Sequence, residues 1–214
     1  MYFSSVNILV DNQSWILQHA TILYNKLKEL NLKVRLVRSH NDLDYADVTF
    51  LLGCTQIVST ENLSKSKYNL VVHESALPQG RGFAPMAWQI INGVNTIPIS
   101  LIDATDKIDG GKIWLQKQMY LNGDELYDEW RSIQGEYTIA LCLEFIVSYD
   151  TLVAQPQKGE ASYYKRRTPE DSELDVNQSI AQQFDLLRTV DNENFPAFID
   201  YRGSRYTILI NKQK

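Results

Sequence analysis

Glycine is missing from the N-terminal part of this 214-residue chain, whose first glycine is Gly53. The first turn between a strand and a helix is expected at 11–14, and it reads Asp-Asn-Gln-Ser. It therefore lacks the G-x-G-x-x-G that cradles a dinucleotide pyrophosphate. Gly110-Gly111-Lys112 lacks the rest of a phosphate-binding loop, and Gly53-Cys54-Thr55 is not a G-x-S-x-G nucleophile turn. These absences argue against a dinucleotide-dependent dehydrogenase, a P-loop ATPase and a serine hydrolase.

Cysteine and histidine are also scarce. Cys54 and Cys142 both lie in apolar runs, which is typical of buried free thiols. The three histidines, His19, His40 and His73, have no short ligand spacing with the cysteines. The sequence therefore predicts no metal site.

Long apolar runs and a basic N-terminal region are absent, so we expect neither a membrane span nor a signal peptide. The formal net charge is −5, and the one basic cluster, 165–167, is followed at once by acidic residues. This balance disfavours nucleic-acid binding over a broad face. The cluster could still hold one or two phosphates or pair with the acids after it. A cytoplasmic enzyme or binding protein is expected.

The first part of the chain alternates between strand and helix signals. The expected strands are residues 6–10, 33–37, 47–52, 69–72, 98–103 and 112–121. The expected helices are residues 15–30 with Ser14 as N-cap, a short one capped by Ser59, 84–92 and 124–148. This order predicts an α/β fold with a mostly parallel sheet. Ligands bind at the carboxyl ends of such strands, and His73 lies at the end of the fourth.

The remainder of the chain reads differently. Residues 151–162 are polar and contain proline and glycine, so they are expected to form a linker. A helix is expected within 175–189 and a β-hairpin at 197–210, with its turn near Arg202-Gly203. We therefore expect a catalytic domain at 1–150 and a C-terminal extension at 151–214. The hairpin offers an exposed pairing edge, which suggests a homodimer.

One motif is specific. Residues 73–93 read HESALPQGRGFAPMAWQIING, and Asp109-Gly110-Gly111 follows after a further strand. This resembles the pattern N-x-H-x-S-L-L-P-x-x-x-G-x-x-P-x-x-W, then D-x-G, of the folate-dependent formyltransferases. The resemblance extends from the first strand to about residue 148. It is weaker in 163–171 and 187–198, which look like the nucleotide-sugar N-formyltransferases.

The resemblance implies a Rossmann-like formyltransferase fold and N10-formyltetrahydrofolate as co-substrate. It also implies catalytic roles for His73 and Asp109. His73 would donate a hydrogen bond or proton to the oxyanion that forms when an amine attacks the formyl carbon. Asp109 would stabilise the imidazolium and accept the proton of the amine.

The remaining site residues are carried over by position. The resemblance assigns the pterin to backbone groups of two segments, Gln56-Ile57-Val58 and Ala104-Thr105-Asp106. The substrate would contact residues in and around the turn after His73, which are Ser75, Arg81, Gly82 and Pro85.

The chain departs from the family at Val71, where the pattern has asparagine. Side chains two residues apart on a strand share a face and lie about 6.6 Å apart along it. Asn69 is on the same face but about 13 Å from His73 by the same arithmetic, so it can assist only if a bulge intervenes. Gln56 or a backbone N–H is the other candidate for the second donor.

These observations lead to a functional hypothesis with alternatives. The first is transfer of a formyl group from N10-formyltetrahydrofolate to the amine of a nucleotide-linked amino sugar, a UDP- or dTDP-4-amino-4,6-dideoxy sugar. The alternatives are a methionyl-tRNA or glycinamide ribonucleotide formyltransferase-like activity, and a folate- or nucleotide-sugar-binding module without catalysis. The acidic balance makes the tRNA alternative less attractive. The 214 residues are also too few for the additional C-terminal barrel of the tRNA enzymes, so we do not expect that barrel here.

Overall fold

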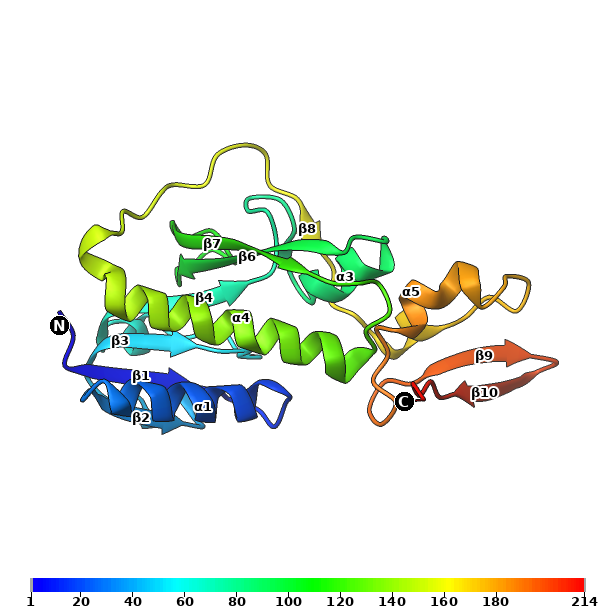
Figure 1. Ribbon diagram of the computed structural model, residues 1–214, viewed down its shortest axis with the longest axis horizontal. Helices are drawn as coiled ribbons and strands as arrows, with labels where there is room; N and C mark the ends of the chain where they lie inside the picture. The colour runs from blue at the N-terminus through cyan, green and yellow to red at the C-terminus, as the bar shows by residue number, and fades with distance from the viewer. Residues whose placement is uncertain (1, 214) are drawn as a thin grey trace.

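A six-stranded sheet forms the centre of the protein, whose computed structural model describes residues 2–213 (Figure 1). The strand order is β2-β1-β3-β4-β6-β7. The strands are β1 (Ser5–Leu9), β2 (Lys33–Val37), β3 (Ala46–Leu51), β4 (Ser66–His73), β6 (Thr96–Asp103) and β7 (Ile113–Tyr120). The first four run parallel, and β6 and β7 extend the sheet antiparallel. The predicted α/β class with a mostly parallel sheet is confirmed.

Alternation along the strands separates the two faces of this sheet. Ile8 of β1 and Leu70 of β4 belong to the main core, which lies under the long helices α1 (Ile16–Glu29) and α4 (Tyr127–Ser148). Leu9 and the partly buried Val71 belong to a smaller cluster on the opposite face. His73 follows Val71 by two residues, so its side chain also faces away from the two helices.

The helices begin for different local reasons. Ser59 accepts a hydrogen bond from the N–H of Asn62 at 3.2 Å, which confirms it as the cap of α2 (Thr60–Leu63). Ser14 was predicted to cap α1, and this is wrong, because Trp15 occupies the N-cap position without a side-chain cap bond. The turn before α1 is already helical, so the Ser14 carbonyl accepts the N–H of Leu17 instead.

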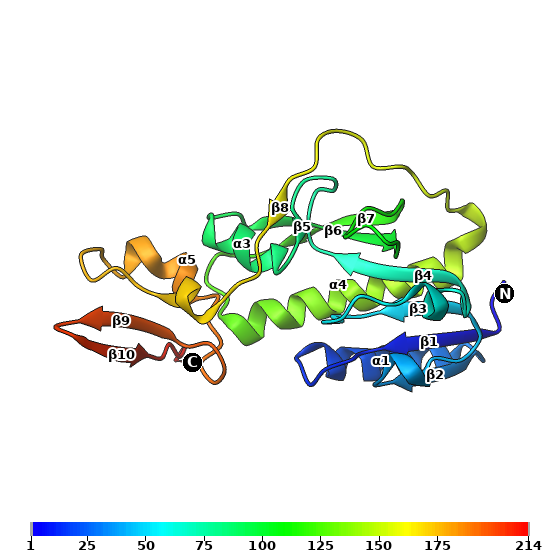
Figure 2. The same cartoon turned by 180° about the vertical axis from the view of Figure 1, so that it is seen from behind.

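The remaining elements are short. They are β5 (Arg81–Gly82), α3 (Pro85–Ile91), β8 (Tyr163–Tyr164), α5 (Phe184–Leu187), β9 (Ala197–Tyr201) and β10 (Ser204–Ile208), with 3₁₀ turns at His40–Asp42, Tyr149–Thr151, Pro169–Ser172 and Ala181–Gln183. Sequence patterns did not predict β5 and β8, which pair in parallel beside the sheet (Figure 2).

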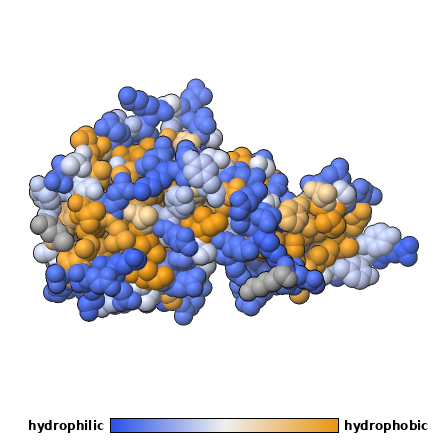
Figure 3. Space-filling model, in the orientation of Figure 1, coloured by the Kyte–Doolittle hydropathy of each residue, from blue (hydrophilic) through white to orange (hydrophobic). Residues whose placement is uncertain are grey.

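The C-terminal part extends from one end of the sheet domain (Figure 1). The predicted hairpin is present as β9 and β10, with Arg202-Gly203 in its turn. It closes over a small core of Leu174, Leu187, Val190 and Ala197, and apolar side chains also gather on the visible surface of this part (Figure 3). The division at residue 150 stays a prediction. No helix between residues 2 and 213 is long and apolar enough to cross a membrane.

Helices α1 and α4 approach each other closely where His19 meets Gly135. A Cβ built on Gly135 would lie 2.4 Å from three atoms of the His19 ring, and the His19 side chain is itself buried. A glycine in the middle of a 22-residue helix is unfavourable by about 1 kcal/mol relative to alanine. Its presence is explained by the space that the imidazole needs.

We therefore expect Gly135→Ala to destabilise the protein by about 1–3 kcal/mol despite the better helix propensity of alanine, because the side chains must move apart. Urea unfolding of the single variants and of the Gly135→Ala/His19→Ala double variant measures this. Removing the imidazole makes room for the new methyl group, so the double variant should be more stable than the sum of the single effects predicts. A Gly135→Ala variant as stable as the parent protein would contradict the close packing.

Candidate active site

A cavity of about 480 Å³ lies where β3 and β4 end. It is lined by the loop after β3 (53–58), the end of β4 (71–74), the turn at 82–85 and the loop after β6 (102–109). The motif that begins at His73 and the segments assigned to folate, 56–58 and 104–106, all contribute to this cavity.

His73 is buried and makes two polar contacts. Its Nε2 lies 2.8 Å from the carbonyl oxygen of Gly80, and its Nδ1 lies 3.5 Å from an Asp109 carboxylate oxygen. A carbonyl oxygen can only accept, so Nε2 carries a proton in this arrangement. Nδ1 is then the nitrogen that is directed toward Asp109, and it can donate a hydrogen bond only in the imidazolium form.

Asp109 is held in position from two sides. The N–H of Gly82 donates to the same carboxylate oxygen at 2.8 Å, and the side chain of Gln157 donates to the Asp109 carbonyl at 2.7 Å. The backbone of Asp109 is left-handed, with φ of 47°. The structure thus brings His73 and Asp109 together, and their catalytic roles stay a prediction.

Gly82 allows this close arrangement. Its φ is +98°, and a Cβ at this position would lie 2.4 Å from the backbone oxygen of Tyr164. Any other residue would push β8 away from the turn that holds the Asp109 carboxylate.

The residues assigned to folate all line the cavity. These are Gln56, Ile57, Val58, Ala104, Thr105 and Asp106. Within residues 2–213, the backbone N–H groups of Ile57, Val58, Thr105 and Asp106 make no hydrogen bond. They are therefore available to a ligand.

The residues assigned to substrate are divided. Gly82 and Pro85 line the cavity. Ser75 is buried, and its hydroxyl has no hydrogen-bond partner in the described chain. Arg81 does not line the cavity, and its guanidinium donates to the side-chain oxygen of Gln157 at 2.6 and 3.2 Å.

Asn69 does not join His73. Its amide donates to the carbonyls of Leu63 at 2.7 Å and Ser66 at 3.2 Å, which fixes the connection between α2 and β4. The β4–β6 register is regular from Leu70 to His73, so no bulge brings Asn69 closer. Val71 lines the cavity with an apolar side chain where the motif has asparagine.

The basic cluster contributes one cation to the cavity. Lys165 pairs with Asp171, and Arg167 donates to Thr189, so both are used within the protein. Arg166 lines the cavity and stacks on the ring of Phe83, 4.5 Å from its centre. The sequence alone does not distinguish the three basic residues, because only the fold shows which of them lines the cavity.

A buried polar chain lies behind the strand end. Glu74 accepts a hydrogen bond from the Gln134 amide at 2.6 Å, and Gln134 accepts one from Arg131 at 2.8 Å. Burial raises the pKa of Glu74, and His73, the Gln134 amide and Arg131 act in the opposite direction. These contacts connect the end of β4 to α4.

Asp11 anchors one wall of the cavity, a role that sequence reasoning missed. It was visible only as a polar residue after the first strand. Its carboxylate accepts the N–H of Thr55 at 2.9 Å and the N–H of Gln56 at 3.1 Å, and it contacts His40 at 3.1 Å. Burial acts to raise the pKa of Asp11, but these bonds and the Asn12 amide outweigh it and lower the pKa to about 2.

The Asp11 contacts make the stability depend on pH. The pKa in the folded state, about 2, lies below the ordinary 3.8, so ionised Asp11 stabilises the fold above about pH 4. This contribution, about 2 kcal/mol, is lost as the pH falls through about 2.

We expect Asp11→Asn to be less stable at neutral pH and to lose less stability on acidification. Urea unfolding between about pH 6 and pH 2.5 measures this. Asp44→Asn, at a carboxylate that is 66% exposed, is the control. Parallel pH profiles for Asp11→Asn and the parent would contradict the assignment.

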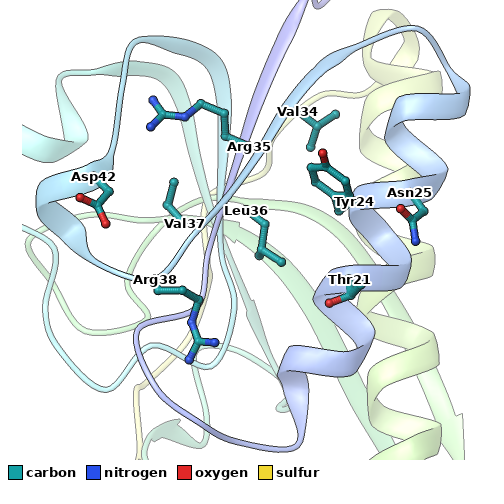
Figure 4. A pocket seen from close by; sticks show the side chains of 9 residues that line it. All are labelled: Thr21, Tyr24, Asn25, Val34, Arg35, Leu36, Val37, Arg38 and Asp42. Atoms are coloured by element: carbon teal, nitrogen blue, oxygen red, sulfur yellow. The ribbon is translucent and has the colours of Figure 1, made fainter.

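A second hollow of about 680 Å³ lies between α1 and β2 (Figure 4). It is lined by residues such as Tyr24, Arg35 and Arg38. Arg35 pairs with Asp44, and Arg38 donates to the Val10 carbonyl. No residue predicted to carry chemistry lines this hollow, so the cavity beside His73 is the candidate active site.

Comparison with known proteins agrees with this geometry. A family model described as formyl transferase matches residues 19–130, which is more than half of the chain. This chain belongs to the formyl transferase family. The match contains both His73 and Asp109.

Curated relatives of this formyl transferase chain include methionyl-tRNA formyltransferases. One from Ehrlichia ruminantium is 27% identical over 165 residues, which cover 76% of this chain and 53% of the relative. One from Mycoplasma capricolum is 25% identical over 209 residues, covering 89% of this chain and 64% of the relative. The chain thus spans about half to two thirds of the length of these relatives.

Solved structures share the fold. A methionyl-tRNA formyltransferase from Clostridium thermocellum has a TM-score of 0.82 at 23% identity, covering 99% of this chain and 94% of that one. A sugar N-formyltransferase from Shewanella has a TM-score of 0.67 at 17% identity, covering 99% and 98%. HypX from Aquifex aeolicus in complex with tetrahydrofolic acid has a TM-score of 0.79 at 17% identity, covering 98% of this chain and 38% of HypX. The formyltransferase fold is therefore shown for nearly the whole chain.

Proposed function

We propose that this protein is an N-formyltransferase that moves a formyl group from N10-formyltetrahydrofolate to the amine of a nucleotide-linked amino sugar. The observation that carries the proposal is the contact of His73 and Asp109 at the wall of a cavity, in a member of the formyl transferase family. A histidine–carboxylate pair can both stabilise developing negative charge and remove a proton.

The two residues have separate roles in this proposal. When the amine of the acceptor adds to the formyl carbon, negative charge develops on the formyl oxygen. Protonated His73 donates to that oxygen from Nδ1, because Nε2 is held by the Gly80 carbonyl. Asp109 accepts the proton that the amine loses and returns it to N10 as the bond from the formyl carbon to N10 breaks.

The cavity fits a folate. Its walls combine apolar side chains such as Ile57 and Val58 with the free backbone N–H groups of the two assigned segments. A flat pterin ring offers apolar faces and a polar edge, which such walls can bind. The formyl donor supplies an activated one-carbon group. The side chains of this chain stabilise the oxyanion and transfer the proton.

The nucleotide sugar is supported by two observations. Arg166 places a guanidinium at the cavity, where it can bind a diphosphate. A sugar N-formyltransferase shares the fold over 98% of its own length. A homodimer through the β9–β10 hairpin stays a prediction.

Formylation of methionyl-tRNA is the second candidate function. It is favoured by the curated relatives, which are methionyl-tRNA formyltransferases. The net charge of −5 and the internal pairing of Lys165 and Arg167 oppose it, because tRNA binding requires a broad cationic surface.

Parallel assays separate the two candidates. The protein is incubated with N10-formyltetrahydrofolate and either UDP- and dTDP-4-amino-4,6-dideoxyglucose or methionyl-tRNA, and products are identified by mass spectrometry. A sugar that gains one formyl group supports the proposal. Formylation of methionyl-tRNA alone would reject the sugar acceptor, and no product with any acceptor would reject the enzymatic activity.

A further inference from the structure

A segment after the long helix, residues 155–164, crosses the turn that follows His73. We call this segment the strap; in Figure 1 it is the yellow chain that ends in β8. Three backbone N–H groups of the turn donate hydrogen bonds to it. Gly80 N–H donates to the Ser162 hydroxyl at 2.9 Å, Arg81 N–H to the Ser162 carbonyl at 3.0 Å, and Phe83 N–H to the Tyr164 carbonyl at 3.2 Å.

Gln157 is the strap side chain that reaches the loop carrying Asp109. Its amide nitrogen donates to the carbonyls of Asp109 at 2.7 Å and Gly111 at 2.8 Å. Its amide oxygen accepts from the guanidinium of Arg81 at 2.6 and 3.2 Å. One half-buried side chain thus connects the Asp109 loop to the turn at 80–82.

The turn at 80–82 also holds both His73 and Asp109, the pair that we call the dyad. The Gly80 carbonyl accepts from Nε2 of His73, and the Gly82 N–H donates to the Asp109 carboxylate. The left-handed backbone of Asp109 costs about 1–2 kcal/mol, so this loop needs contacts that stabilise it. Gln157 supplies two of them.

We propose that Gln157 is a positioning residue of the active site, whose amide fixes the Asp109 loop against the turn at 80–82 so that the carboxylate faces Nδ1 of His73. The expected effect of Gln157 on turnover rests on the proposed function. The expected effect of Gln157 on the geometry of His73 and Asp109 is independent of that function. Gln157 does not line the cavity, so it acts through Asp109 and not on the substrate.

Gln157→Glu separates the two halves of the contact. The carboxylate keeps an acceptor for Arg81, so the strap stays attached to the turn. It loses both N–H donations and places an oxygen against the carbonyls of Asp109 and Gly111, which repels the loop. Gln155→Glu is the matched control, because it makes the same chemical change on the strap while its amide contacts only the nearby Val153 carbonyl.

The steady-state experiment compares these variants with the parent protein, using N10-formyltetrahydrofolate and the amino-sugar nucleotide that is turned over. We expect Gln157→Glu to lower kcat by about 10- to 100-fold, because small displacements of a catalytic group have effects of this size. The KM for the acceptor should change much less, and Gln155→Glu should match the parent. Gln157→Asn, which keeps the amide on a shorter side chain, should recover part of the loss. A kcat for Gln157→Glu equal to that of Gln155→Glu would overturn the proposal.

A second readout needs no turnover. In ¹⁵N-labelled protein, the Gly82 amide and the His73 ring nitrogens report directly on the carboxylate between them. We expect Gln157→Glu to move these resonances and Gln155→Glu to leave them in place. Unmoved Gly82 and His73 signals in Gln157→Glu would overturn the proposal whatever the turnover. A parent protein without formylation activity would reject the proposed function, and the spectra would still decide the role of Gln157.

Discussion

Replacing His73 by alanine is expected to lower kcat for formyl transfer by about 10³-fold, since a preorganised donor to an oxyanion typically contributes 10²–10³ in rate. In this protein the loss should be at the upper end, because Val71 supplies no second donor beside it. Quantitative mass spectrometry of the formylated product measures the effect.

A measurement of folate binding distinguishes the loss of a catalytic group from damage to the structure of the cavity. The segments assigned to the pterin are 56–58 and 104–106, and they do not depend on the imidazole. His73→Ala should therefore bind 5-formyltetrahydrofolate, a stable analogue, as tightly as the parent in calorimetric titration. Undiminished turnover by His73→Ala would refute the mechanism.

Changing Asp109 to asparagine is expected to lower kcat by about 10²-fold or more, a typical contribution of general acid–base catalysis. Asparagine has nearly the same shape, and its amide oxygen can still accept the N–H of Gly82. What disappears is the negative charge opposite Nδ1 of His73 and the group that receives the proton of the amine. The same product assay measures the loss.

Asp106→Asn is the matched control for this second prediction. Asp106 lies on the same loop and lines the same cavity, and only its backbone, which the substitution leaves in place, is assigned to the pterin. It removes an equal charge without touching the dyad. If the two variants lose activity equally, the charge of the loop and not the Asp109 carboxylate would be responsible.

Much of the sheet could be predicted from the sequence because burial leaves a local pattern. The runs around Ile8 and Leu70 are apolar on consecutive positions, as expected for strands that are covered on both faces. The antiparallel direction of β6 and β7 is not visible in such runs, since both directions bury the same residues. Ser14 shows a similar limit, because a serine before a helix favours a cap without ensuring one.

The candidate site was predictable only in part. The motif identified His73 and Asp109, and the fold brings them to 3.5 Å. The contributions of Asp11 and Gln157 depend on contacts between segments that are distant in the sequence, so no local pattern indicates them. Residues 151–162 read as a linker because they are polar, although Ser162 contacts the turn beside His73 and Gln157 contacts the Asp109 loop. β5 and β8 escaped prediction because strands of two residues have no periodicity.

The strap also has a consequence for how the protein is made. Gly80 and Ser162 are 82 residues apart in the chain, and Arg81 and Gln157 are 76 apart. Closing such long loops has an entropic cost that local contacts do not share. During synthesis, β1 to β4 and α1 can assemble from residues already released by the ribosome, whereas the turn beside His73 still lacks its partner. We therefore expect catalytic competence to be acquired late, after residues 157–164 have emerged. A nascent chain that ends within α4 contains His73 and Asp109 but lacks the strap contacts to the turn and to the Asp109 loop.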